Sequence, residues 1–308
     1  MSDARPLVWM PFDAEKLGSP PSSLRYERFL PEEHDGVPAS VAEVEFYVPP
    51  YRFSVADSEV IRQMPRLKVV QTMTAGVEHI RPYVPEGVQL CNGRGIHNAS
   101  TAELAVGLVI ASLRGIPDFV RAQDRGEWRP IRARSLADRT VLIVGYGDIG
   151  AAIEERLTGF EVDVVRVARR AREGVHGYDE LAGLLPHADV VILIVPMTDE
   201  TRGLVDRDFL SRMKDDALLV NVARGPVVDT DALVEALNTG RIHAALDVTD
   251  PEPLPEGHPL WSAPNLLISP HVGGASSAMK PRAYRLVRQQ LERFAAGEPM
   301  TNVMTGTY

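Results

Sequence analysis

Short apolar runs recur along the chain from residue 141 onwards, and more polar stretches with a helical pattern separate them. Several of these runs are rich in β-branched residues and almost continuously apolar, which is typical of strands buried on both faces of a parallel sheet. We therefore predict strands in this part of the chain over residues 141–144, 162–167, 190–195, 218–222, 242–248 and 266–269.

Helical patterns lie between these strands, and we predict helices over residues 150–157, 178–185, 206–213 and 229–237. Strands and helices in alternation form βαβ units, whose strands are parallel and whose helices cover both faces of the sheet. This part of the chain is therefore expected to form a doubly wound α/β domain.

The first 95 residues indicate a smaller α/β domain. Its strand candidates are weaker, and two proline-rich stretches interrupt them. We predict strands there over residues 7–10, 43–48, 67–71 and 88–91.

Two further helices connect the domains. An apolar helix over residues 101–113 leads into the second domain, and an amphipathic helix over residues 281–296 can fold back onto the first. We expect a discontinuous first domain of residues 1–97 and 278–308, and a second domain of residues 98–277. The segment 115–136 has no clear place in either domain, and we interpret it as an arm that packs on a partner subunit.

Composition narrows the function classes. The 308 residues are 44% hydrophobic with a net charge of −9, which argues against nucleic acid and membrane surfaces as partners. No apolar run approaches the roughly 20 residues that span a bilayer, and the N-terminal residues show no signal-peptide pattern. Cys91 is the only cysteine, which excludes an intrachain disulfide and a cysteine-based metal cluster. We expect a cytoplasmic protein without a metal site.

The sequence VLIVGYGDIG, residues 141–150, places a G-x-G-x-x-G pattern between a predicted strand and a predicted helix. Gly145 allows a tight turn, Gly147 lets the backbone approach a pyrophosphate, and Gly150 allows the helix to pack closely on the strand. The N-terminus of the helix offers N–H groups and the positive end of its dipole to phosphates. This pattern predicts a dinucleotide-binding turn.

The end of the next strand indicates which dinucleotide binds. An NAD site usually has an Asp or Glu about 20 residues beyond the turn, where it binds the ribose 2′-hydroxyl. Here Ala168 stands at that position, and Arg169 and Arg170 follow it. A carboxylate would repel a 2′-phosphate, whereas an arginine binds it bidentately. We therefore predict NADP(H), with NAD as the alternative cofactor; the arginines could also form only a solvated basic turn.

Three later strands end in side chains that carry chemistry. Arg224 follows one strand, Asp247 ends the next and precedes Glu252, and His271 follows the last. An arginine at the end of a buried strand needs an anionic partner. That partner is either a bound substrate or a carboxylate of the protein in a structural ion pair. A lone histidine is often structural, but this one shares the sheet edge with the dinucleotide turn, where open α/β sheets bind ligands.

Reduction of a 2-keto acid needs these residue types. An arginine can bind both the carboxylate and the carbonyl oxygen of the substrate. A histidine can supply the proton that this oxygen takes up near neutral pH. A carboxylate close to the imidazole favours its charged form, and we assign this role to Glu252. The residues thus predict hydride transfer between NADP(H) and a small 2-keto/2-hydroxy acid.

These motifs together resemble those of the D-isomer-specific 2-hydroxyacid dehydrogenases, which include glyoxylate/hydroxypyruvate reductases and phosphoglycerate dehydrogenases. The similarity covers roughly residues 65–300. It is carried by the glycine turn and by TAGVE (74–78), TAELA (101–105), VPMTDETRG (195–203), NVARG (221–225), ALDV (245–248) and SPHVGG (269–274). The first 60 residues match least, so the side group of the acid is not predicted.

The resemblance implies a fold of two Rossmann-like α/β domains, doubly wound parallel sheets with a cleft between them, and usually a homodimer. It implies Arg224, Glu252 and His271 as the catalytic triad. Ala75 and Gly76 would present backbone N–H groups to the substrate beside Arg224 and His271. The cofactor would lie along Thr101, Gly145, Tyr146, Gly147, Asp148, Ile149, Gly150, Arg169, Arg170, Val195, Pro196, Thr201, Val222, Ala223, Arg224, Asp247, His271 and Gly273.

Two other functions fit the same scaffold. A dinucleotide-sensing corepressor would use the fold without turnover, and it predicts an interaction tail that we do not find in this sequence. A formate or phosphite dehydrogenase would keep the Arg, Glu and His residues. Arg169 and Arg170 favour NADPH-driven reduction over such an oxidation.

Overall fold

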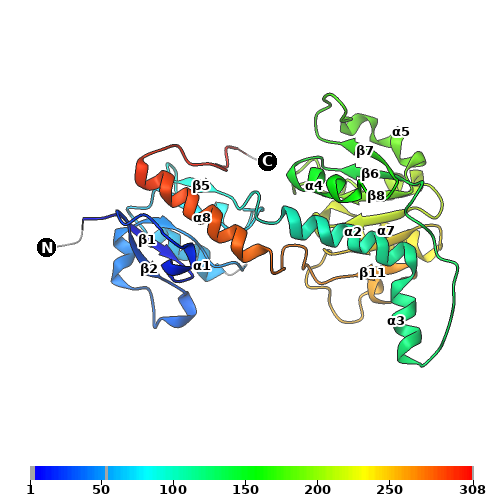
Figure 1. Ribbon diagram of the computed structural model, residues 1–308, viewed down its shortest axis with the longest axis horizontal. Helices are drawn as coiled ribbons and strands as arrows, with labels where there is room; N and C mark the ends of the chain where they lie inside the picture. Colours follow the sequence, from blue (N-terminus) through cyan, green and yellow to red (C-terminus); the bar gives the residue numbers. More distant parts are fainter. Residues whose placement is uncertain (1–3, 53–54, 307–308) are drawn as a thin grey trace. The chain divides into compact units, whose positions relative to one another are not determined.

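The computed structural model describes residues 4–52 and 55–306, and the chain divides into two compact units (Figure 1). The first unit is Met1–His97 with Ser277–Tyr308, and the second is Asn98–Ser276. The chain therefore leaves the first unit once and returns to it with its last helix.

The first unit is built on a five-stranded parallel sheet in the order β2-β1-β3-β4-β5. Leu7 of β1 pairs with Arg25 on one side and with Val44 on the other. The chain order reverses at β1, which is typical of doubly wound folds. The strands are β1 (Leu7–Met10), β2 (Arg25–Arg28), β3 (Val44–Tyr47), β4 (Val69–Gln71) and β5 (Gln89–Cys91).

Both faces of this sheet are buried, which explains why β1, with the sequence LVWM, is continuously apolar. Successive side chains of a strand point to opposite faces. In β1, Val8 and Met10 join one core, whereas Leu7 and Trp9 join the core on the opposite face. The Trp9 ring stacks on that of Phe29, with 4.1 Å between the ring centroids.

Helix α8 (Met279–Ala296) covers one face of the first sheet, as its spacing of apolar residues dictates. Met279, Ala283, Val287 and Leu291 recur every four residues, which places them on one side of the helix, and all four are buried. After α8 the chain returns to the sheet edge, where Val303 pairs with Cys91 in β5.

The second unit is built on a six-stranded parallel sheet in the order β11-β10-β9-β8-β6-β7. Val141 of β6 pairs with Val164 in β7 and with Val190 in β8, so the chain order reverses at β6. The carboxyl end of such a strand is where open α/β sheets bind ligands. The strands are β6 (Thr140–Val144), β7 (Asp163–Val167), β8 (Val190–Leu193), β9 (Leu218–Asn221), β10 (His243–Leu246) and β11 (Leu266–Ile268).

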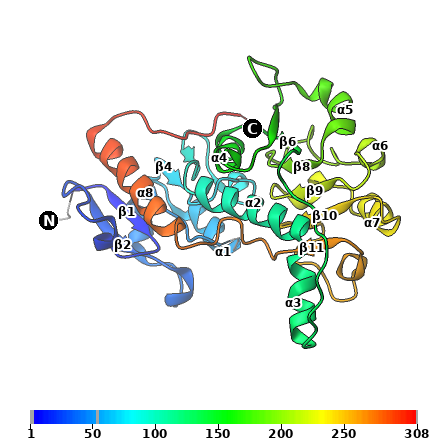
Figure 2. The same ribbon diagram turned by 45° about the vertical axis from the view of Figure 1, so that its right-hand side comes forward.

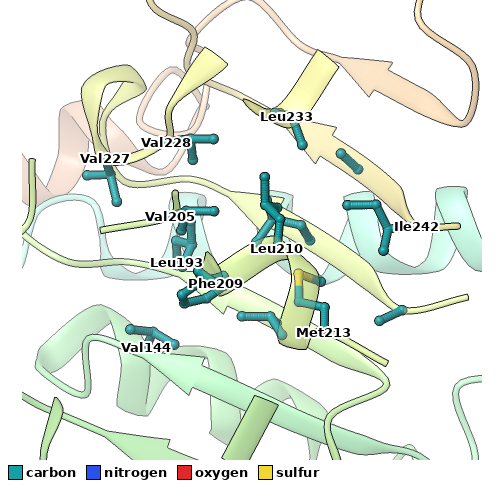
Figure 3. Close-up of a cluster of buried hydrophobic side chains, with 14 of the residues drawn as sticks. Val144, Leu193, Val205, Phe209, Leu210, Met213, Val227, Val228, Leu233 and Ile242 are labelled. Atoms are coloured by element: carbon teal, nitrogen blue, oxygen red, sulfur yellow. The ribbon is translucent and has the colours of Figure 1, made fainter. Parts of the chain in front are cut away.

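Helices cover both faces of the second sheet. On one face, Ala102 and Val109 of α2 and Ile153 of α4 pack on apolar strand residues. On the other face, residues of α6 and α7 such as Phe209, Leu210 and Leu233 form a second core with Val144 and Leu193 of the strands, as Figure 3 shows. These helices are α2 (Asn98–Arg114), α4 (Asp148–Leu157), α5 (Leu181–Leu184), α6 (Arg207–Arg212) and α7 (Thr230–Asn238).

The remaining elements are short. Two α-helices are α1 (Val55–Glu59) and α3 (Ile116–Asp124). The 3₁₀ helices are η1 (Ala14–Leu17), η2 (Pro31–Glu33), η3 (Ala39–Glu43), η4 (Val60–Gln63), η5 (Arg81–Tyr83), η6 (Tyr178–Glu180), η7 (Leu185–His187), η8 (Gly225–Val227) and η9 (Pro259–Ser262). In the described part of the chain, no single helix has the length and apolar composition to cross a membrane; α2 and α3 pass that test only as a pair bent by 66°.

Every strand predicted from the sequence is present, and each end differs from its prediction by at most two residues. The pattern does not indicate β2, whose residues RYER are polar and only partly buried. This strand lies at the sheet edge, where pairing with β1 stabilises it without an apolar face.

One helix prediction needs correction. The helix predicted over residues 178–185 is wrong as a single helix, because only α5 is α-helical and η6 and η7 flank it. Pro186 lacks an N–H group and so ends the α-helical pattern. The segment 115–136, interpreted from the sequence as an arm with no clear place in either domain, belongs to the second unit and contains α3, which projects away from the sheet of that unit (Figure 2).

Candidate active site

The turn after β6 has the geometry that its three glycines predict. Gly145 has a φ of 109°, and a Cβ atom on it would lie 2.5 Å from the carbonyl carbon and oxygen of Ile194. A Cβ on Gly150 would lie 2.5 Å from the Gly145 oxygen, so α4 packs closely on the turn. A Cβ on Gly147, in contrast, would meet no atom within 4 Å. The turn is therefore crowded by backbone atoms at Gly145 and Gly150. Gly147 faces open space, which fits a pyrophosphate.

Helix α4 begins directly at this opening. Gly147 is its N-cap, and Asp148 lies exposed in its first turn. The first N–H groups of a helix have no partner within the helix, and the helix dipole adds a partial positive charge there. The turn and the helix together thus fit the phosphates of a dinucleotide.

The loop after β7 carries the predicted arginines. The Ala168 N–H donates to the His176 oxygen at 3.0 Å, so the loop folds back on the strand. Arg169 and Arg170 are exposed, and the charge of Arg169 acts on the hydroxyl of Tyr178. Burial nevertheless raises the pKa of Tyr178 above its usual value.

The structure adds an arginine that the sequence analysis did not select. Arg172 donates from Nη2 to the Tyr146 oxygen at 2.7 Å, within the glycine turn itself. Its signal was present in the sequence as the third arginine of the run ARRAR, but only the fold of the loop brings it to the turn.

The loop after β8 lies beside Gly145. Thr201 is buried, and its hydroxyl donates to the Pro196 oxygen at 2.7 Å and accepts from the Thr198 N–H at 2.9 Å. Val195 is also buried. Thr201 therefore holds the shape of this loop through its own hydrogen bonds.

The end of β9 positions Arg224. The side chain of buried Asn221 accepts from the Ala223 N–H and donates to the Arg224 oxygen, each at 3.0 Å. A Cβ on Gly225 would lie 1.8 Å from the Thr249 oxygen, so only glycine permits this contact. The close approach brings the loop of Arg224 against the loop that leads to Glu252. Sequence analysis missed Asn221, although its place at the end of a buried strand was a signal.

Asp247 organises the loop that carries His271. Its carboxylate is buried and accepts from the Ser269 hydroxyl at 2.6 Å, the Val272 N–H at 2.9 Å and the Gly273 N–H at 2.8 Å. Its backbone oxygen accepts from the His271 N–H at 2.7 Å. A Cβ on Gly273 would lie 2.9 Å from the same carboxylate, which explains the glycine.

The carboxylate that the sequence analysis places beside the imidazole lies in contact with it. His271 Nδ1 is hydrogen-bonded to Glu252 Oε1, and both side chains remain about one-third exposed or more, at 33% and 40%. His271 has a φ of 53°, a left-handed conformation that costs a non-glycine residue about 1–2 kcal/mol. The hydrogen bond from its N–H to Asp247 holds that conformation.

The remaining predicted residues lie in two places. Thr101, in α2, donates to the Gly273 oxygen at 3.3 Å and so contacts the same loop as Asp247. Ala75 and Gly76 belong to the first unit, after β4. Asn92 donates to the Ala75 oxygen at 2.9 Å, and the Thr74 hydroxyl donates to the Gly76 oxygen at 2.7 Å, so their loop is braced from within that unit.

We expect Asp247→Asn to loosen the His271 loop. One acceptor oxygen becomes an NH₂ group, which leaves a loop donor unsatisfied and lowers the free energy of unfolding by about 1–3 kcal/mol. Hydrogen exchange at the amides of Val272 and Gly273 should accelerate. Asp163→Asn, at an exposed position of β7, is the matched control; unchanged exchange in Asp247→Asn would contradict the assignment.

Comparison with known proteins agrees with this geometry. Residues 106–273 match the family model described as the NAD binding domain of the D-isomer specific 2-hydroxyacid dehydrogenases. A glyoxylate reductase from Thermofilum pendens is 36% identical over 79% of this chain and 76% of its own length.

Solved structures are similar over nearly the whole chain. A D-isomer specific 2-hydroxyacid dehydrogenase from Xanthobacter autotrophicus, in complex with NADPH and MES, has a TM-score of 0.80 at 32% identity, covering 97% of both chains. An NADPH-dependent glyoxylate/hydroxypyruvate reductase from Sinorhizobium meliloti, in complex with NADP and malonate, has a TM-score of 0.79 at 28% identity, covering 98% of this chain and 97% of its own. With a family model that matches more than half of its residues, the chain belongs to the D-isomer specific 2-hydroxyacid dehydrogenase family.

Proposed function

We propose that the protein is an NADPH-dependent reductase of short 2-keto acids such as glyoxylate and hydroxypyruvate. The observation that carries this proposal is the placement of Arg224 and the Glu252–His271 pair at the ends of strands in the unit that contains the glycine turn. Relatives named as glyoxylate reductases support the substrate class.

NADPH is proposed as the cofactor on two grounds. Ala168 leaves no carboxylate at the end of β7, and the arginines that follow, Arg169 and Arg170 among them, supply positive charge for a 2′-phosphate. Similar solved structures contain NADPH or NADP. When bound, the cofactor supplies the hydride. Around it we place Thr101 and the residues of the glycine turn, with Val195, Pro196, Thr201, Val222, Ala223 and Gly273 of the later loops.

Arg224 is assigned to substrate binding. Its guanidinium can accommodate a carboxylate and polarise a neighbouring carbonyl oxygen, because its donors are arranged in a rigid fork. The Asn221 hydrogen bonds and the Gly225 contact fix the backbone from which it extends. Ala75 and Gly76 are assigned as further donors to the carboxylate, through their N–H groups.

His271 is assigned to proton transfer. In the reduction, a proton moves from Nε2 to the carbonyl oxygen as the carbon gains the hydride. Glu252 binds Nδ1, which fixes the orientation of the ring. Asp247 acts one step further away, since it holds the loop and not the reacting atoms.

The reaction class is tested by the decay of NADPH absorbance, with NADH in parallel, over glyoxylate, hydroxypyruvate, pyruvate and phenylpyruvate. We expect turnover with a short acid and faster consumption of NADPH than of NADH. Failure to turn over any of these acids, despite measurable NADPH binding, would contradict the proposed reaction and favour a sensing role for the scaffold.

Arg224→Gln should remove the cation that binds the substrate. We expect kcat/KM for the best keto acid to fall by about 10²-fold or more, as for loss of a donor to a developing oxyanion. NADPH binding, measured by fluorescence titration, should stay nearly unchanged. Arg114→Gln, at an exposed end of α2, controls for the change in charge, and full activity in Arg224→Gln would disprove the assignment.

We also propose a homodimer formed through the arm, the segment 115–136 that begins with α3. Half of the large apolar side chains that are exposed in the described chain lie on it, namely Ile116 (43%), Phe119 (41%), Val120 (53%), Trp128 (97%) and Ile131 (41%). Both signs of charge alternate along the arm, for example in Asp118, Arg121, Asp124 and Arg125. A surface with both signs can pair with its own copy across a twofold axis.

The proposed interface predicts a solution mass of twice 33.8 kDa, measurable by light scattering after size exclusion. The double variant Phe119→Ser with Trp128→Ser should shift the mass to that of one chain, because the exposed apolar area is lost. Trp261→Ser, at another exposed tryptophan (57%), should leave the mass unchanged. A double variant that keeps the mass of two chains would place the interface elsewhere.

A further inference from the structure

Tyr146, the residue between the first two glycines of the turn, contacts two arginines from the same neighbouring region. The guanidinium carbons of Arg166 and Arg172 lie 5.7 and 5.8 Å from the centroid of its ring. Its hydroxyl donates to Glu154 of α4. The ring is thus fixed beside the point where the turn is open to a ligand.

The charge of Arg166 is neutralised by its own partner. Glu154 accepts from Nε of Arg166 at 2.7 Å and forms a second hydrogen bond with its Nη2. This pairing holds the pKa of Glu154 below its usual value, and the carboxylate therefore stays ionised. Arg166 is a structural support of Tyr146 and offers little net charge to an anion.

Arg172 differs from Arg166 in this respect. Within residues 4–52 and 55–306, no carboxylate pairs with Arg172, whose guanidinium donates to the Tyr146 oxygen at 2.7 Å. That bond uses one of its five N–H donors. The side chain is exposed, so the other donors can reach an incoming ligand at the turn.

The backbone of the loop fixes Arg172 at this place. Arg172 and Val175 exchange two hydrogen bonds, of 2.9 and 2.8 Å, around a turn in which Gly174 has a φ of 69°. Val175 is buried and anchors the turn. The position of Arg172 is therefore set by main-chain hydrogen bonds on one side and by the turn carbonyl on the other.

The neighbouring surface is less favourable for an anion. A hollow of about 520 Å³ beside Tyr146 is lined by Glu154, Glu155 and Glu173, and Arg166, the cation among its lining residues, is already paired with Glu154. The carboxylates would repel a phosphate. An anion is therefore favoured outside this hollow, where the Arg172 guanidinium contacts the Tyr146 carbonyl.

We propose that Arg172 is the principal ligand of the cofactor's 2′-phosphate, with the Tyr146 carbonyl holding its guanidinium against the glycine turn. This inference rests on the proposed use of NADPH. Selection of NADPH over NADH then depends chiefly on Arg172, which contacts the glycine turn. Arg169 and Arg170, which directly follow Ala168 at the end of β7, contribute less.

The test measures binding of adenosine 2′,5′-bisphosphate and of 5′-AMP by calorimetry, because the two differ only in the 2′-phosphate. Arg172→Gln should raise the Kd for the bisphosphate by about tenfold or more, because hydrogen bonds to a charged group are lost. Binding of 5′-AMP should stay unchanged. Arg114→Gln should affect neither ligand, and thermal unfolding confirms that each variant is folded.

Single variants Arg169→Gln and Arg170→Gln separate the competing assignments. We expect each to reduce the preference for adenosine 2′,5′-bisphosphate over 5′-AMP less than Arg172→Gln does. Selectivity that survives in Arg172→Gln but disappears in Arg169→Gln, or equal losses for both ligands in Arg172→Gln, would overturn the inference. A wild-type protein that binds both ligands equally would overturn the NADPH proposal with it. Selective binding without keto-acid turnover would leave the inference standing and contradict only the proposed reaction.

Discussion

One buried carboxylate holds the candidate active site together. Asp247 ends β10, and its side chain takes three hydrogen bonds from the loop after β11, while its carbonyl takes the N–H of His271. A buried carboxylate must be satisfied by donors, so the loop has little freedom to move without exposing an unpaired charge. The left-handed backbone of His271 persists for the same reason. The orientation of the imidazole toward Glu252 thus depends on a residue that acts through the backbone of the loop.

Close backbone approaches complete the arrangement. Parallel strands bring their carboxyl ends to one edge of the sheet, but they do not decide how near the following loops come to each other. Gly225 lets the Arg224 loop lie against Thr249, and Gly145 lets the dinucleotide turn lie against Ile194. Any side chain at either position would separate the loops. The chemistry-bearing residues therefore depend on glycines that carry no chemistry themselves.

Much of this architecture could be predicted from sequence because it depends on local patterns. Buried parallel strands are continuously apolar, and the run from Val190 to Leu193 is unmistakable in this respect. The glycine turn has a fixed spacing for a geometric reason. In contrast, β2 is stabilised by pairing at a sheet edge and has no such pattern. The apolar spacing of residues 178–185 favours one helix, but Pro186 ends its α-helical part at Leu184. Arg172 and Asn221 each have a signal in the sequence, but their roles arise from loop conformations that no local spacing encodes.

The first unit uses both ends of the chain, and this has a consequence for biosynthesis. Proteins are made from the N-terminus, and domains generally fold as units as they emerge. The 98–276 unit is contiguous and can fold once its own residues are available. The sheet of the first unit is synthesised earlier, yet one of its faces stays uncovered until α8 emerges, after the whole 98–276 unit. Nascent chains of this protein therefore carry an apolar surface that is made before the 98–276 unit and covered only after it, and chaperones have that interval in which to bind there.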